Sequence, residues 1–158
     1  MEKTTATSAE KHCFTITFKD DEHAAFFWKN FRKYQQHDVY HMALIYCLGI
    51  NTDTRRNIHR IYDFQTGLIK PGCLREGWQT SGSLKVVRLA FNLYTGGIPS
   101  IYHDLKEEID EAQLYSVTDI FCTNDARYFW EAIKIRFPNY CFDGGTNDVE
   151  NPASGYKV

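Results

Sequence analysis

Apolar residues recur at helical spacing along much of the chain, beginning with Phe27, Phe31 and Tyr34 in the segment that follows KDDEH. Asp20 or Asp21 in that stretch can accept hydrogen bonds from the free backbone amides at the start of a helix. Before it, CFTITF alternates apolar and polar side chains, which is typical of a short strand. The N-terminal part therefore predicts one short strand or hairpin and then a helix with an aromatic face.

Two further segments with helical patterns follow, HDVYHMALIYCLGI and NTDTRRNIHRIYDF. Asp38 stands near the start of the first and Gly49 near its end, and Thr52 or Asp53 can cap the second. The next stretch, QTGLIKPGCLREG, combines glycines with a proline and so predicts a turn-rich connection.

The segment GWQTSGSLKVVRLAFNLYTGG fits either a phosphate-binding loop or a capped helix start. A nucleotide-binding loop needs GxxxxGK[ST], but Ser83 follows the second glycine here and Lys85 is displaced by two positions. Thr80, Ser81 or Ser83 can instead cap a helix over residues 81–94. Because its apolar residues cover two neighbouring faces, we expect this to be a central helix packed on both sides.

The last third of the chain predicts shorter helices. DLKEEIDEAQLYS is acidic and is expected to form a short exposed helix or an ordered loop. Ser116 can cap a helix in SVTDIF, and Asn124 or Asp125 can cap the helix of NDARYFWEAIKIRF, which Pro138 ends.

These elements predict a mostly α fold, a single compact domain of five to seven helices over residues 13–141. Residues 1–12 are expected to be a flexible N-terminus and residues 142–158 a loose C-terminal tail. With 158 residues, 43% of them hydrophobic, the chain has enough apolar material for one core. The expected core residues are Phe27, Phe31, Leu44, Ile58, Leu84, Val87, Phe91, Phe129 and Ile133.

Charge and targeting features narrow the class of protein. The net charge is -2, from 18 basic and 20 acidic residues, whereas a dedicated duplex-DNA binder carries a basic excess. The chain begins without a secretory signal and has no apolar run of membrane-spanning length, so we expect a cytoplasmic protein without a membrane span. The five cysteines are widely spaced, which favours free thiols, and Cys47 and Cys122 lie in apolar runs expected in the core.

HDVYH places His37 and His41 four residues apart, a spacing that can chelate zinc on one helical face. The metalloprotease signature HExxH would need glutamate where Asp38 stands, and no third ligand stands out. None of the cysteines and histidines belongs to a local signature of nucleophile and base. We therefore expect ordinary histidines, no metal, no cofactor and no catalytic residue.

Basic residues form one candidate binding surface. TRRNIHR contributes Arg55, Arg56 and Arg60, and the predicted helix 81–94 adds Lys85 and Arg88; we call these five the basic strip. Such residues can contact the phosphates of RNA or DNA. The alternatives are a solvated face with intrahelical ion pairs, or contact with an acidic protein partner.

Acidic residues form a second candidate surface in DLKEEIDE. Clustered carboxylates can present negative charge to the nucleic-acid groove of another protein and compete with its natural ligand, whereas the simpler interpretation is a solvated helix. We call this group the acidic patch; it consists of Asp104, Glu107, Glu108, Asp110 and Glu111.

Two segments, IYDFQTGLIKPGCLREGWQTSGSLKVVRLAFNLYTGG and ARYFWEAIKIRFPNYC, carry a resemblance. They resemble a family of small uncharacterised proteins carried on plasmids, conjugative elements and phages of Gram-positive bacteria. The similarity extends from about Phe14 to Cys141. Because some small proteins in such genetic contexts are anti-CRISPR or other anti-defence factors, the resemblance implies an anti-defence role, but it assigns no catalytic residues.

The sequence thus favours a non-enzymatic protein-interaction factor of a mobile genetic element, an anti-CRISPR-type inhibitor that binds a host defence nuclease through the acidic patch. The first alternative is an accessory protein that binds RNA or DNA through the basic strip. A further alternative is an unrecognised hydrolase or nuclease. The aromatic content of 15% leaves room for a homodimer face.

Overall fold

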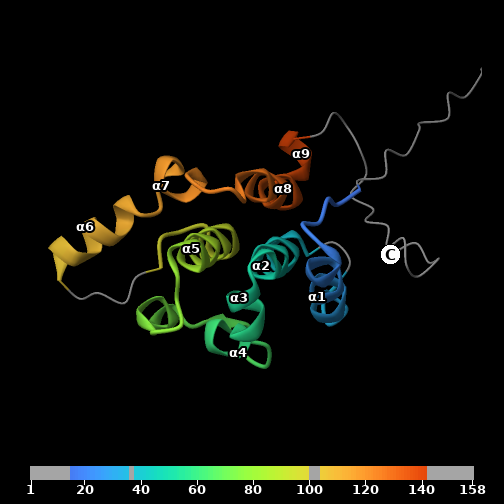
Figure 1. Cartoon of the computed structure of the whole chain (residues 1–158), viewed down its shortest axis with the longest axis horizontal. Coiled ribbons are helices and arrows are strands. Elements are labelled where there is room, and N and C mark those ends of the chain that lie inside the picture. Colours follow the sequence, from blue (N-terminus) through green and yellow to red (C-terminus); the bar gives the residue numbers. More distant parts are fainter. Residues whose placement is uncertain (1–14, 36–37, 100–103, 142–158) are drawn as a thin grey trace, which may run out of the picture.

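The computed structural model describes residues 15–35, 38–99 and 104–141, and these form nine α-helices, one 3-10 helix and a two-stranded sheet. Helices α1, α2, α5 and α8 pack together, and the other helices and the sheet lie in the connections between them (Figure 1). The elements in chain order are α1 (Asp21–Phe31), α2 (Val39–Ile50), α3 (Thr52–Arg56), α4 (Ile58–Ile61), β1 (Tyr62–Asp63), β2 (Leu68–Ile69), η1 (Pro71–Arg75), α5 (Ser81–Thr95), α6 (Leu105–Gln113), α7 (Val117–Phe121), α8 (Ala126–Arg136) and α9 (Pro138–Cys141).

The mostly α, single-domain fold predicted from the sequence is confirmed. Five of the helices, α1, α2, α5, α6 and α8, have nine residues or more, and the other four have four or five. Two of the short ones, α3 and α4, arise where a single predicted segment is interrupted, and α7 is the helix predicted in SVTDIF. The interrupted segment, NTDTRRNIHRIYDF, is divided at Asn57 into α3 and α4 and then enters β1.

The predicted strand at the N-terminus is wrong in its described part. Residues 15–18 belong to no strand, and Cys13 and Phe14 lie outside the described residues. The backbone of Thr17 is instead satisfied by side chains: its amide donates to Glu131, and its carbonyl accepts from the Tyr46 hydroxyl. The small antiparallel sheet lies at β1 and β2, where Tyr62 is opposite Ile69.

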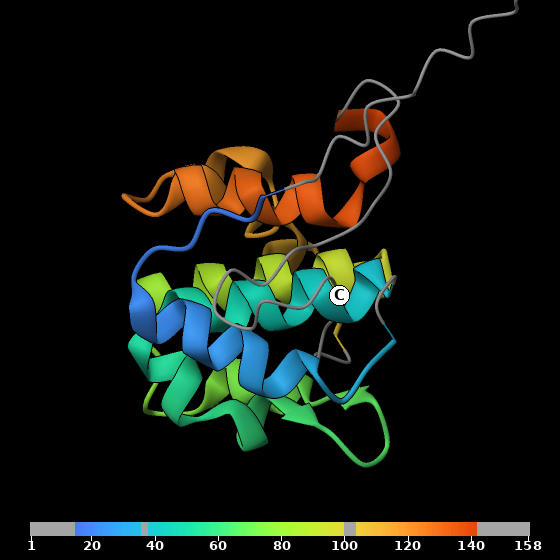
Figure 2. The ribbon, with the colours of Figure 1, turned by 90° about the vertical axis from the view of Figure 1, so that its right-hand side faces the viewer.

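Helix α2 is at the centre together with α5, which is packed on more than one side as predicted for residues 81–94, since it contacts α2, α3, α7 and α8. Every residue from Met42 to Ile50 is buried, and α2 packs against α1, α3, α5 and α8. Figure 2 shows α8 lying across one side of the α2–α5 pair, with α4 and the hairpin on the other side. Near the ends of α5, Leu84 and Tyr94 are half-buried.

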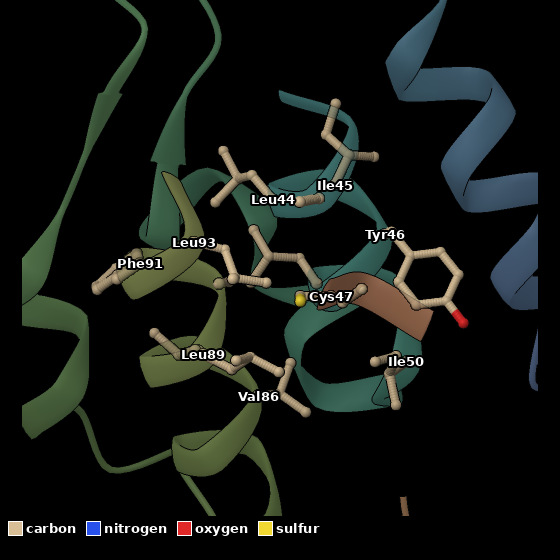
Figure 3. Packing of buried hydrophobic residues seen from close by; sticks show 14 of the residues in the cluster. Leu44, Ile45, Tyr46, Cys47, Ile50, Val86, Leu89, Phe91 and Leu93 are labelled. Atoms are coloured by element: carbon tan, nitrogen blue, oxygen red, sulfur yellow. The ribbon is translucent and has the colours of Figure 1, made fainter. Parts of the chain in front are cut away.

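The core forms where α2 meets α5. Leu44, Cys47 and Ile50 from α2 join Val86 and Leu89 from α5 in one cluster of buried side chains (Figure 3). Seven of the nine predicted core residues are buried, Leu84 and Ile133 being the two that are half-buried. Ile133 still packs against the cluster.

The start of α5 settles the interpretation of the glycine-rich segment. Thr80 accepts from the Ser83 amide and Ser83 accepts from the Thr80 amide, so a capping box begins the helix. At the other end Gly96 has φ 70°, the left-handed conformation that glycine adopts without strain. Asp20 caps α1, as one of the two alternatives at that position, whereas Asn51 and not Thr52 or Asp53 caps α3.

Cys47, Cys73, Cys122 and Cys141 are free thiols, as predicted, whereas Cys13 lies outside the described residues. The expectation that Cys122 is a core residue is wrong. It is exposed, because it follows the last residue of α7. In the part of the chain that the structure describes, we find no helix with both the length and the apolar character needed to cross a bilayer.

Candidate functional site

Helix α6 contains the acidic patch. Asp104 caps it: its side chain accepts from the backbone amides of Lys106 and Glu107 at 2.9 and 3.3 Å. Glu107 and Glu108 stand in the first turn, where carboxylates interact favourably with the positive end of the helix dipole. A cap and acidic residues in the first turn therefore explain why this polar segment is a helix and not a loop.

The outward face of α6 is both acidic and apolar. Leu105 is 71% exposed and Ile109 51% exposed. They are one helical turn apart and therefore lie on the same side of the helix. The residues Asp104, Glu107, Glu108 and Asp110 of the acidic patch are exposed as well. In Figure 1, α6 lies at the outer edge of the molecule, beside α7 and beyond α5.

The inward residue of α6 is a glutamate. Glu111 is the one buried residue of this helix, and both of its carboxylate oxygens contact the Arg88 guanidinium of α5. Nε of Arg88 lies 2.8 Å from Oε1 and Nη2 lies 3.3 Å from Oε2. The two side chains are only 11% and 5% exposed. One member of the basic strip and one of the acidic patch are thus paired with each other inside the protein.

The remaining members of the basic strip are divided between internal contacts and the surface. The Arg55 side chain is 11% exposed; its guanidinium donates to the Gly49 carbonyl at 2.7 Å and to Glu22 at 2.7 Å. Lys85 donates to the carbonyl of Cys122 at 2.6 Å and so connects α5 to the end of α7.

Arg56 and Arg60 are the two residues of the basic strip that are exposed. Arg60 is 59% exposed and forms an ion pair with Glu76. The structure therefore leaves two exposed arginines, on α3 and α4, where the sequence predicted a strip of five basic residues.

A third cluster, which the sequence reasoning missed, surrounds His41 at the start of α2. Asp38 contacts the ring nitrogen Nδ1 at 2.5 Å and also accepts from the His41 amide at 3.1 Å. On the other side of the ring, Nε2 lies 2.9 Å from the Tyr62 hydroxyl and 3.2 Å from that of Tyr94. Tyr34 stacks on the imidazole with ring centres 3.9 Å apart.

The protons in this cluster can be assigned from its contacts. Tyr34 donates to Tyr62, and Tyr94 donates to the Gly67 carbonyl at 2.8 Å. Each phenol has one proton, so Tyr62 is left to donate to Nε2 of His41 while Nδ1–H donates to Asp38. The cluster thereby connects the loop after α1, the hairpin and the end of α5 to the start of α2.

A carboxylate, an imidazole and a hydroxyl that are connected by hydrogen bonds also form the arrangement with which enzymes activate a nucleophile. Here, however, Tyr62 is fully buried, and burial raises the pKa of its phenol. Burial likewise raises the pKa of Tyr34. Neutral phenols that point into the protein are suited to holding elements together. The spacing of Asp38 and His41 was the one local signal for this cluster, because its tyrosines come from distant segments.

Of the other histidines, His23 is bonded within the chain and His59 is exposed. His23 is fully buried, its Nδ1 accepts from the Lys19 amide and its Nε2 lies 2.8 Å from the Tyr46 carbonyl. Burial lowers its pKa to about 4, so the ring is neutral. His37, the other member of the predicted pair with His41, lies outside the described residues. Within the ranges described, no three His, Cys, Asp or Glu side chains are grouped as metal ligands would be.

Comparison with known proteins yields one match. A family of unknown function, DUF6075, matches residues 13–148, which is most of the chain. No curated protein and no solved structure matches this chain.

Proposed function

Because the chain belongs to the DUF6075 family, whose function is unknown, we propose a role from its surfaces: a non-enzymatic, cytoplasmic protein-interaction factor that binds a basic partner protein through α6. The observation that carries this proposal is the outward face of α6. Leu105 and Ile109 are exposed there among carboxylates, while Glu111 is the residue turned inward. Exposed apolar residues surrounded by charge are typical of protein interfaces.

The charge of α6 favours a basic partner. Its exposed carboxylates, Asp104, Glu107, Glu108 and Asp110, outnumber the single exposed lysine, Lys106. Opposite charge on the partner accelerates association and fixes its orientation, while the two apolar residues supply area that is dehydrated on binding.

A second copy of the chain is a poor occupant of the same surface. In a two-fold symmetric dimer each patch faces its own copy, so two acidic helices would repel each other. If the chain forms the homodimer that its aromatic content allows, α6 is therefore not expected to be the dimer face.

A protein with a nucleic-acid groove is the class of partner that fits best, because such grooves are basic. Together with the resemblance to proteins of mobile elements, this leads us to propose that the factor belongs to a mobile genetic element. Its partner would be a host defence protein such as a CRISPR nuclease, and an acidic helix in the nucleic-acid groove would inhibit it.

The experiment compares three forms of the full chain: wild type, the double variant Leu105→Gln/Ile109→Gln, and the control Leu68→Gln. Leu68 is 64% exposed and lies on the hairpin, so it is an exposed apolar residue like those of α6 but lies outside the proposed binding surface. Each form is immobilised, exposed to nuclease-treated host lysate, and the bound proteins are identified by mass spectrometry. We expect a basic nucleic-acid-binding protein to be retained by wild type and Leu68→Gln and lost by the double variant. Equal retention by all three would overturn the proposal.

Direct contact with RNA or DNA is the second candidate function. The exposure of Arg56 and Arg60 favours it, while Arg55, Lys85 and Arg88 are bonded to protein groups. It predicts that Arg56→Glu/Arg60→Glu lowers the affinity for single-stranded RNA or DNA at 50 mM salt. Fluorescence anisotropy measures this, and an affinity that is the same for the variant and the wild type excludes these arginines as the contact.

A further inference from the structure

Helix α6 buries a glutamate and exposes its two large apolar residues. Residues of an α-helix advance by about 100° each. Leu105, Ile109 and Ala112 therefore lie together on one side, at spacings of four and three, and Glu111 lies on another. A surface helix normally packs its apolar side on the core. In α6 the buried residue is Glu111 and Ala112 is half-buried, whereas the two large apolar residues, Leu105 and Ile109, are exposed.

The reason for this orientation lies on α5. Arg88 is 9% exposed and stands between the buried residues Val87 and Leu89, so its guanidinium needs a partner within the protein. Glu111 supplies both carboxylate oxygens to it. If α6 rotated to bury Leu105 and Ile109, Glu111 would move away and Arg88 would remain as an unpaired buried charge.

We propose that Arg88 and Glu111 are positioning residues that set the rotation of α6 and thereby create its binding surface. With Glu111 turned inward, Ile109 points away from α5 and Leu105 lies beside it. Glu108 lies on one flank of this apolar pair, and Lys106 and Asp110 lie on the other. The partner segment that fits this surface is an apolar groove with basic groups on the rim that faces Glu108. This part of the inference rests on the proposed function, whereas the control of α6 by the ion pair does not.

The rotation of α6 can be measured in the free protein. The variant Arg88→Met removes the charge but keeps a long side chain, and Lys85→Met removes another cation of α5, the one that contacts the end of α7. Two readouts report on α6: hydrogen exchange of the peptide that covers residues 105–113, and the rate of thiol labelling when Ile109→Cys is added. The labelling is followed on the peptide that contains position 109, so the native cysteines do not interfere.

In Arg88→Met we expect α6 either to rotate, which slows labelling at position 109, or to detach, which speeds hydrogen exchange of 105–113 by about tenfold or more. Exchange in α2 and α8 should stay as in the wild type. The conservative Arg88→Lys should restore part of the wild-type behaviour, and Lys85→Met should leave both readouts unchanged. If Arg88→Met labels and exchanges like the wild type, the inference is wrong.

Should Arg88→Met fail to fold, Glu111→Gln gives the same test, since it removes the charge and keeps the shape. A wild-type pattern in that variant would likewise overturn the inference. Capture of the partner separates this inference from the proposed function. If α6 changes in Arg88→Met while Leu105→Gln/Ile109→Gln still binds the partner, the positioning role stands and α6 is not the binding surface.

Discussion

The polar groups around His41 and the polar groups of α6 differ in where their partners lie. Around His41, the carboxylate of Asp38 and the phenols of Tyr34, Tyr62 and Tyr94 all find hydrogen-bond partners within the chain. On α6, four of the five residues of the acidic patch face the solvent, and two large apolar residues face it with them.

This difference separates a structural role from a binding role. Groups that are bonded to each other inside a protein hold its elements together, and little remains of them for another molecule. Apolar and charged groups that the fold leaves exposed are available to a partner. By this reasoning His41, although it resembles part of a catalytic triad, belongs to the framework, and α6 is the surface that we propose binds other molecules. Perturbing the first region should therefore change stability, and perturbing the second should not.

The largest effect is expected from pH acting on the interior. The pKa of His23 is lowered by burial to about 4, from 6.5 in the unfolded chain. The unfolded state therefore binds more protons between these values, and stability falls as the pH drops from about 6.5 towards 4, by up to about 1.4 kcal/mol per pH unit and about 3 kcal/mol in all.

Urea denaturation at a series of pH values measures this loss. His23→Gln cannot gain the charge, so its stability should change less over the same range than that of the wild type. If the two pH profiles are parallel, His23 is not the group responsible.

Removal of the central ring of the His41 cluster should cost nearly as much. His41→Ala leaves Asp38 and Tyr62 without their shared partner, and buried polar groups left unpaired cost about 1–3 kcal/mol. We expect the free energy of unfolding to fall by about 2 kcal/mol, measured by urea denaturation. His59→Ala, at an exposed position, serves as the control and should change it by less than about 0.5 kcal/mol. An equal, small effect of both variants would contradict the structural role of His41.

A smaller loss of stability should follow from crowding the interior around His23. A Cβ atom added at Gly49 would lie 2.5 Å from Cδ2 of the buried His23 ring, so one of the two must move. Gly49→Ala should therefore lower the free energy of unfolding by about 1–2 kcal/mol through overpacking. At Gly77 an added Cβ meets nothing within 4 Å, so Gly77→Ala is the matched control. A thermal melt of each variant compares them, and a melting temperature of Gly49→Ala equal to that of Gly77→Ala would refute the predicted clash.

The smallest effect on stability is expected on α6. Leu105→Gln/Ile109→Gln replaces residues that the fold leaves exposed, so the free energy of unfolding should change by less than about 0.5 kcal/mol. A loss above about 2 kcal/mol would mean that these side chains are part of the core in solution, and the comparison between the two regions would fail.

Features of the fold that depend on neighbouring residues could be predicted from the sequence. The capping positions Asp20, Thr80 and Ser116 were among the predicted ones, because a cap is a contact between residues two or three apart. The central position of α2 could not be predicted from the sequence. The wide apolar cover of residues 81–94 pointed to α5 alone as the central helix. The position of α2 follows from its contacts with α1, α3, α5 and α8, which join segments distant in the sequence.

The candidate site was predictable only in its charges. The acidic patch was found from composition, but Glu111 pairs with Arg88, which is 23 residues away, and no local pattern reveals such a contact. The exposure of Leu105 and Ile109 contradicts the usual rule that apolar residues of a helix face inward. The cluster around His41 was missed because Tyr62 and Tyr94 come from segments distant in the sequence.

The footprint of the captured partner on this chain is the decisive test of α6 as the binding surface. Hydrogen exchange is measured on the full chain, alone and in complex with the protein that it retains from nuclease-treated lysate. Binding should slow exchange in the peptide of residues 105–113 and leave the peptides around His41 unchanged. Protection confined to other segments, with α6 exchanging as in the free chain, would contradict this role of α6.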